Sequence, residues 1–168
     1  MPLREAVSRT APRRETVSRA LTAGECAIVA RVFGDAIDCG PVRVNRLKWW
    51  MWQPHWVTMA PDGQLWFHPN GDVWSDDFAA ERIGLRGHFV HEMVHVWQHQ
   101  SGIDLRLRRL PFARYRYLPL VLGKAFGRYG IEQQAEIVRD AYLLAQGVPL
   151  EGRQPLADYA ALIPFWPS

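Results

Sequence analysis

The sequence is poor in cysteine and has no long apolar run. Its two cysteines, Cys26 and Cys39, are too few for a disulfide framework and lack zinc-ribbon spacing. No apolar run reaches the roughly 20 residues that span a bilayer. No signal-peptide apolar region follows the N-terminal arginines either. We therefore expect a protein without a membrane span that is cytoplasmic in the cell that makes it, and any export would use a route without a cleaved signal.

The sequence also lacks a large excess of charge of one sign. The formal net charge is +3, and the first twenty residues hold five arginines against two glutamates. The remaining 15 basic and 15 acidic side chains balance, since the whole chain has 20 and 17. Nucleic-acid-binding domains usually carry a basic excess on the folded surface, so we expect no nucleic-acid partner. We interpret residues 1–20 as a flexible basic tail, residues 21–168 as one domain, and the basic run at 106–116 as a solvated face.

Local patterns predict an α+β domain. Thr22 and Glu25 have capping-box spacing at the start of a helix that Gly34 ends. Residues 41–47 alternate like a half-buried strand, and residues 57–69 read as a hairpin around Pro-Asp-Gly. Apolar spacing then predicts one helix over about 85–100 and another within 129–147. The intervening tryptophan-rich stretch, 48–56, is typical of packing on a small sheet or of a carbohydrate or peptide platform.

The richest motif is "HFVHEMVHVWQHQ", residues 88–100, which contains an H-E-x-x-H pentapeptide. Positions i and i+4 share one face of a helix, so His91 and His95 can converge on one ion. Glu92 lies between them and can accept a proton from metal-activated water. Only His91 and His95 enclose a glutamate at the position that a base needs, so we assign the flanking His88 and His99 substrate-facing, supporting or surface roles.

A catalytic zinc site needs a third protein ligand. The "HExxHxxGxxH" pattern fails, because Gln98 and Ser101 stand where glycine and histidine are required. The "EQQAE" stretch instead offers Glu132 as the ligand with Glu136 behind it. The alternative, one turn on, is Glu136 as the ligand with Asp140 behind it. We prefer Glu132, and we expect the small Ala135 to let the two helices pack closely.

H-E-x-x-H followed by a helical glutamate resembles the gluzincin metallopeptidases, typified by thermolysin. Further motifs cover most of the chain from about Leu21 to Pro149, among them "TMAPDG", "FHPNG", "FVHEMVHVWQHQ", "PFARYRY" and "RYGIEQQAEIV". Together they look like small bacterial Vgr-related proteins, which are similar to zinc metallopeptidase domains fused to Vgr spike proteins of the type VI secretion system. The resemblance implies a small zincin-like domain, with an N-terminal helix, a short antiparallel sheet whose edge binds substrate, and two ligand-bearing helices.

The expected function is zinc-dependent peptide hydrolysis with one Zn²⁺ per chain and Glu92 as general base. Candidates for contacting substrate or the developing oxyanion are His99, Tyr115, Arg116, Tyr117 and Tyr129. The resemblance further implies an antibacterial effector, delivered to the periplasm of a target cell, with a peptide or protein substrate and a secretion spike or immunity protein as partner. Two alternatives to this function are a zinc-binding docking module without turnover and a hydrolase of peptidoglycan peptides.

Overall fold

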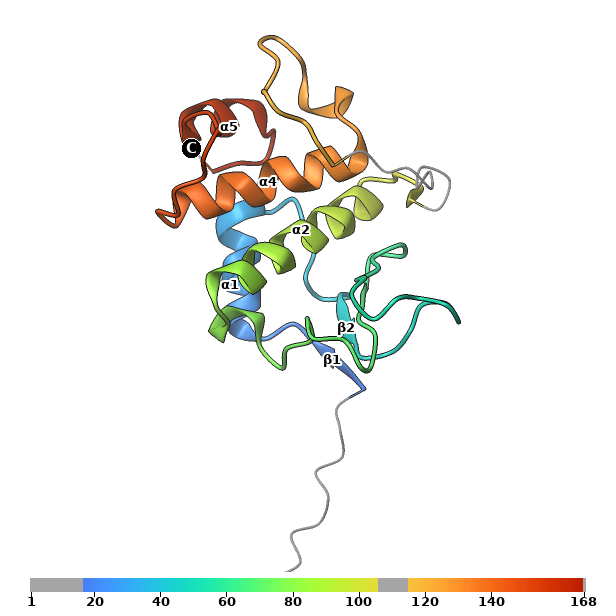
Figure 1. Ribbon diagram of the computed structural model, residues 1–168. Coiled ribbons are helices and arrows are strands. Elements are labelled where there is room, and N and C mark those ends of the chain that lie inside the picture. The colour runs from blue at the N-terminus through green and yellow to red at the C-terminus, as the bar shows by residue number, and fades with distance from the viewer. Residues whose placement is uncertain (1–16, 106–114, 168) are drawn as a thin grey trace, which may run out of the picture.

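The computed structural model describes residues 17–105 and 115–167, and these form a small α+β domain (Figure 1). The basic run at 106–116 and the expected tail at 1–20 therefore lie largely outside the described residues. None of the described helices is long and apolar enough to cross a membrane. The elements in chain order are β1 (Ser18–Ala20), α1 (Ala23–Phe33), β2 (Arg43–Asn45), β3 (Leu65–Trp66), η1 (Phe78–Ala80), α2 (Ile83–Gln100), η2 (Phe126–Arg128), α4 (Ile131–Ala145) and α5 (Leu156–Leu162).

The start of α1 is fixed by the predicted capping box. The Thr22 hydroxyl accepts from the Glu25 backbone N–H at 3.0 Å, and Glu25 accepts from the Thr22 N–H at 2.9 Å. Glu25 is fully buried, and its carboxylate also accepts two 2.8 Å hydrogen bonds from Arg19 and one from the Phe78 N–H. One carboxylate thus joins β1, α1 and η1, and β1 itself comprises Ser18–Ala20.

The sheet is mixed, so the expected antiparallel sheet is only half right. β1 and β2 pair antiparallel, but β2 and β3 are parallel, with Val44 opposite Leu65. The chain from 46 to 64 makes a long excursion between β2 and β3, which lets β3 enter the sheet in the same direction as β2. The predicted hairpin is present in minimal form, as a single antiparallel bridge between Met59 and Trp66.

The helices α2 and α4 lie side by side and form the main packing unit of the domain (Figure 1). Apolar residues on several faces of α2 are buried, as expected of a helix that is covered on more than one side. A Cβ atom added to Gly87 would lie 3.1 Å from Leu143 Cδ2, and Ala135 is fully buried. Small residues at these two positions allow the backbones to approach, which brings the polar side chains of the two helices together.

An aromatic stack ties the sheet side of the molecule to α2. The Phe67 and Phe78 rings stack with centroids 5.3 Å apart, and Phe78 stacks on Phe89 of α2 at the same distance. All three side chains are fully buried. Their packing fixes the segment after β3 against the helix that carries the H-E-x-x-H motif.

Candidate functional site

The predicted metal ligands His91 and His95 are one turn apart on α2, facing α4. Their ring centroids are 5.2 Å apart, and the two residues are 7% and 2% exposed. Imidazoles so buried need polar partners, because an unsatisfied polar group in the interior costs free energy. The partners come from α4 and from α2 itself.

Glu132 of α4 supplies the carboxylate that faces both imidazoles. Its Oε2 atom is 3.2 Å from His95 Nε2 and 3.4 Å from His91 Nε2. One ligand atom from each of the three residues lies within 4.8 Å of the other two. Two imidazole nitrogens and a carboxylate oxygen at this spacing fit a divalent cation such as zinc, which leaves a position for water when three protein groups bind it.

Glu136, the rival ligand, contacts a different atom. Its Oε1 is 2.9 Å from His91 Nδ1, the ring nitrogen on the other side from the one that faces Glu132. Arg139 holds the same carboxylate at 3.1 Å. This is the arrangement of an acid that orients a ligand histidine, and it favours Glu132 as the carboxylate facing the ion.

The electrostatics of the cluster favour an ionised carboxylate. Burial lowers the pKa of His91, but hydrogen bonds to Glu132 and Glu136 outweigh burial and raise it to about 9. Burial likewise raises the pKa of Glu132, yet hydrogen bonds to His91 and His95 hold it well below its usual range. A bound cation would displace the His91 proton, because a metal ligand must be the neutral imidazole.

Gln98 is a site residue that the sequence interpretation missed. Its amide nitrogen donates to the Ile131 carbonyl at 3.0 Å and to Gln134 Oε1 at 2.9 Å. Its oxygen therefore accepts from His95 Nδ1 at 2.9 Å, and this contact turns His95 Nε2 toward Glu132, 3.2 Å away. In the sequence, Gln98 stands out only as the residue that replaces glycine in the HExxHxxGxxH pattern. Its position three residues after His95 is the signal that would have indicated a contact with that histidine.

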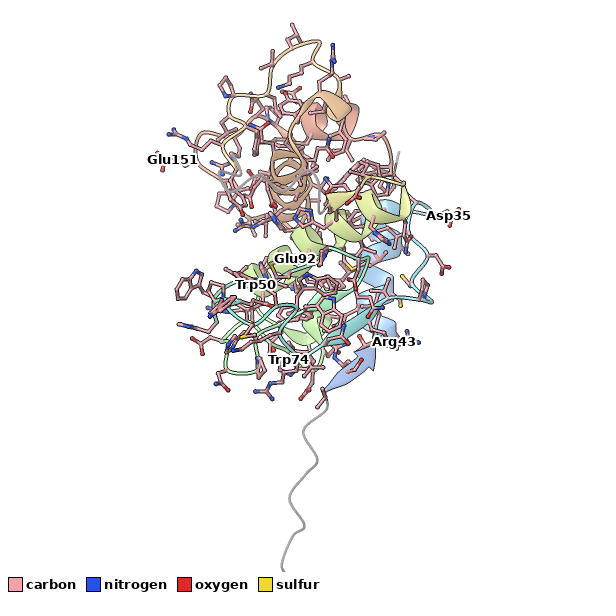
Figure 2. The ribbon with its side chains drawn as sticks, turned by 90° about the vertical axis from the view of Figure 1, so that its right-hand side faces the viewer. Asp35, Arg43, Trp50, Trp74, Glu92 and Glu151 are labelled. Carbon is pink, nitrogen blue, oxygen red and sulfur yellow. The ribbon has the colours of Figure 1, made fainter. Side chains whose placement is uncertain are left out.

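The expected general base, Glu92, is 4% exposed and lies within the interior of the molecule (Figure 2). Its Oε1 is 3.9 Å from His88 Nε2, and its Oε2 has no hydrogen-bond partner among the described residues. His88 in turn is 2.8 Å from the Thr58 hydroxyl, and burial lowers its pKa. An unpartnered buried carboxylate oxygen beside two imidazoles is suited to accept a proton.

Of the aromatic candidates, Tyr115 lies at the site. Its ring stacks against His91 with centroids 6.4 Å apart, and the side chain is 51% exposed. His99 is exposed and packs near Gly63 instead. Arg116 is exposed, and its backbone carbonyl accepts from Gln133 Nε2.

The remaining candidates are engaged elsewhere. Tyr117 is buried and donates a short hydrogen bond to Asp140, which also accepts from Arg153 at 2.6 Å. Asp140 therefore does not stand behind Glu136 as the alternative assignment requires. Tyr129 is buried, and its hydroxyl accepts from the Val121 N–H.

Comparisons with known proteins relate this chain to a spike protein of the type VI secretion system. No protein-family model matches the chain. The chain is 38% identical over 135 residues to the type VI secretion system spike protein VgrG2b of Pseudomonas aeruginosa, an alignment that covers 74% of this chain but 13% of the spike protein. It is also similar to the solved structure of the effector domain of P. aeruginosa VgrG2b, with a TM-score of 0.73 and 35% identity, covering 89% of this chain and 83% of that domain.

Proposed function

The chain belongs to the family of the VgrG2b effector domain, and from this premise we propose that it is a zinc-dependent peptidase acting as a type VI secretion effector. The observation that carries the proposal is the convergence of His91, His95 and Glu132, with Glu92 beside them. This donor set with an adjacent carboxylate is suited to metal-assisted hydrolysis.

His91 Nε2, His95 Nε2 and a Glu132 oxygen would hold the zinc ion. When bound, zinc acts as a Lewis acid that makes water more acidic and polarises a carbonyl group. Glu136 orients His91 through Nδ1, and Gln98 orients His95 in the same way. These contacts hold Nδ1 of each ring, so Nε2 of each imidazole would be the atom offered to the ion.

Glu92 moves the proton. Its Oε2 atom accepts a proton from the attacking water and then passes it to the departing amine of the peptide. His88 lies near the other oxygen, with its Nε2 3.9 Å from Glu92 Oε1. Tyr115 stacks against His91 and is exposed, and its hydroxyl would donate to the substrate carbonyl as negative charge develops.

The proposed role as an effector rests on the similarity of the chain to VgrG2b. VgrG2b is a spike protein, and its effector domain matches most of this chain. We propose that this chain associates with a secretion spike and acts in the periplasm of a target cell. Two substrate classes should be tested. One is the peptides and peptide cross-links of the cell wall, and the other is periplasmic proteins.

The decisive experiment measures zinc content and hydrolysis in the Glu92→Gln variant. We expect about one zinc per chain and a loss of peptide hydrolysis of roughly 10²–10⁴-fold, the usual contribution of a general base. Glu151→Gln makes the same chemical change at an exposed position and should leave both measurements unchanged.

Substrates would be a peptide library and purified sacculi. Full activity of Glu92→Gln would overturn the mechanism. A zinc-loaded wild-type protein that binds a spike but cleaves neither substrate would favour a docking module, and release of soluble fragments from sacculi would identify a cell-wall peptide hydrolase.

A further inference from the structure

Residues 115–117, which we call the tyrosine segment, run beside α4, which in turn lies against α2 (Figure 1). The first of them, Tyr115, stacks against His91 with ring centroids 6.4 Å apart and an angle of 23° between the ring planes. Tyr115 is 51% exposed, so packing in the core alone does not hold its ring over the histidine. The two residues that follow Tyr115 are both tied to α4, and these contacts restrict where Tyr115 can lie.

Tyr117 makes the buried anchor of the tyrosine segment. It is 7% exposed, and its hydroxyl donates a short hydrogen bond to Asp140 of α4. The Tyr159 hydroxyl lies 2.9 Å from the Tyr117 hydroxyl, and Arg153 donates to the same Asp140 oxygen at 2.6 Å. Burial and the hydrogen bond to Asp140 raise the pKa of Tyr117, so the hydroxyl keeps the proton that it donates. A buried network of this kind holds one arrangement, because opening it would leave polar groups unsatisfied in the interior.

Gln133 of α4 makes the second anchor, one residue closer to Tyr115. Its side-chain amide donates to the Arg116 carbonyl at 2.7 Å, and its side-chain oxygen accepts from the Gly130 N–H at 3.0 Å. The same glutamine thus caps the start of α4 and fixes the backbone between the two tyrosines. With Arg116 and Tyr117 both attached to α4, the Tyr115 ring has few positions open to it.

Three acidic residues on successive turns of α4 connect the anchors with the candidate metal cluster. Glu132 faces both imidazoles, Glu136 contacts His91 Nδ1, and Asp140 follows four residues later. Residues four apart lie on the same side of a helix, so one rigid element sets the position of His91 and of the tyrosine segment. Asp140 thus acts on the site through the tyrosine segment.

We infer that Asp140 and Gln133 are positioning residues, which hold the tyrosine segment so that Tyr115 lies against His91 beside the candidate metal site. The consequence for turnover rests on the proposed peptidase function, in which the Tyr115 hydroxyl would donate to the substrate carbonyl. A reacting group misplaced by about 1 Å can cost about 10²-fold in rate. Loss of either anchor should therefore act like loss of the Tyr115 hydroxyl itself.

The first test measures the placement of Tyr115 and needs neither metal nor substrate. NMR spectra of the full chain with labelled aromatic rings should show a nuclear Overhauser contact between the Tyr115 and His91 rings. Tyr117→Phe removes the hydroxyl that binds Asp140 and keeps the ring, and we expect the contact to be lost. Tyr142→Phe makes the same chemical change at another buried tyrosine, which lies on α4, and should retain the contact.

Gln133→Glu is the second anchor variant, and it changes a half-buried position rather than the core. It keeps an oxygen that accepts from the Gly130 N–H but replaces the donor to the Arg116 carbonyl with a second oxygen. Two oxygens cannot form that hydrogen bond, so we expect the same loss of the contact between Tyr115 and His91. Unchanged circular dichroism would show that each variant is folded.

Kinetics of peptide hydrolysis give the functional readout. We expect Tyr117→Phe and Gln133→Glu to lower kcat roughly 10–100-fold with a smaller change in KM, as Tyr115→Phe should. The double variant Tyr115→Phe/Tyr117→Phe should lose no more activity than Tyr115→Phe alone, because the anchor acts only through the Tyr115 hydroxyl. A purely structural role of Tyr117 would instead give additive losses of kcat.

Three results would overturn the inference. The first is a wild-type spectrum without the contact between Tyr115 and His91, and the second is an unchanged contact in both anchor variants. The third is an additive loss of kcat in the double variant. A wild-type protein that shows the contact, which both anchor variants lose, but that hydrolyses no substrate would contradict the proposed peptidase function and confirm the positioning of Tyr115.

Discussion

At the scale of single residues, the site depends on hydrogen bonds that select one tautomer of each histidine. His91 and His95 each direct Nε2 at Glu132, because Nδ1 is held by Glu136 in one case and by Gln98 in the other. These outer contacts do not touch the ion themselves, but they set the direction and basicity of the nitrogens that would.

The Gln98→Leu substitution tests this role. It removes the acceptor of His95 Nδ1 while keeping a side chain of similar size, and we expect zinc affinity to fall about 10–100-fold. Competition with a chromophoric chelator measures the affinity. Gln100→Leu makes the same change at an exposed position of α2 and should bind zinc normally. Equal affinities of the two variants would show that Gln98 serves packing alone.

The two glutamates of α4 should separate in the same assay. Glu132→Ala removes the oxygen nearest to both imidazoles, so we expect the bound zinc to be lost after dialysis. Glu136→Ala removes a contact to His91 Nδ1 and should weaken binding about 10–100-fold without abolishing it. Elemental analysis of both proteins gives the answer, and a larger zinc loss from Glu136→Ala would reverse the assignment.

At the scale of elements, the site exists because α2 and α4 pack closely. The sequence predicted both helices and the spacing of the ligands along them, since apolar periodicity and the H-E-x-x-H pattern are local. It also predicted the Thr22 cap of α1. It did not predict the parallel pairing of β2 and β3, because two- and three-residue strands carry little local signal and their pairing depends on contacts between distant segments.

The Ala135→Leu substitution tests the closeness of the two helices. Ala135 is fully buried, and extra carbon atoms there should cost about 1–3 kcal/mol of unfolding free energy through overpacking. We also expect zinc content to fall, because separation of the helices carries Glu132 away from the imidazoles. Urea unfolding and elemental analysis measure the two effects. Ala145→Leu, at an exposed position of α4, should change neither.

At the scale of the whole molecule, an ion held by α2 and α4 would couple metal binding to folding. The three candidate ligands come together only in the folded chain, so an ion held there would bind the native state in preference to the unfolded one. Contacts between residues distant in sequence could not be predicted, because they also form only when the chain folds. The pairing of Asp140 with Tyr117 and Arg153 arises from segments that meet only after folding.

Removal of the metal should therefore lower the melting temperature. Zinc at about 1,000 times its Kd would add roughly 4 kcal/mol to the unfolding free energy. Differential scanning calorimetry with and without a chelator measures the effect. His95→Ala should melt at the same temperature in both conditions, and a wild-type protein insensitive to the chelator would mean that the cluster holds no ion.

The buried Glu25 carboxylate also decides how this domain can be transplanted. A protein engineer who grafted it onto another carrier at residue 21 would keep all of α1 but discard Arg19, which donates two hydrogen bonds to Glu25. A fully buried carboxylate that loses its charged partner typically costs about 3–5 kcal/mol. A fusion protein that contains this domain should therefore include β1 from Ser18 onward. The junction with the carrier should lie before β1, so that Arg19 stays attached to α1.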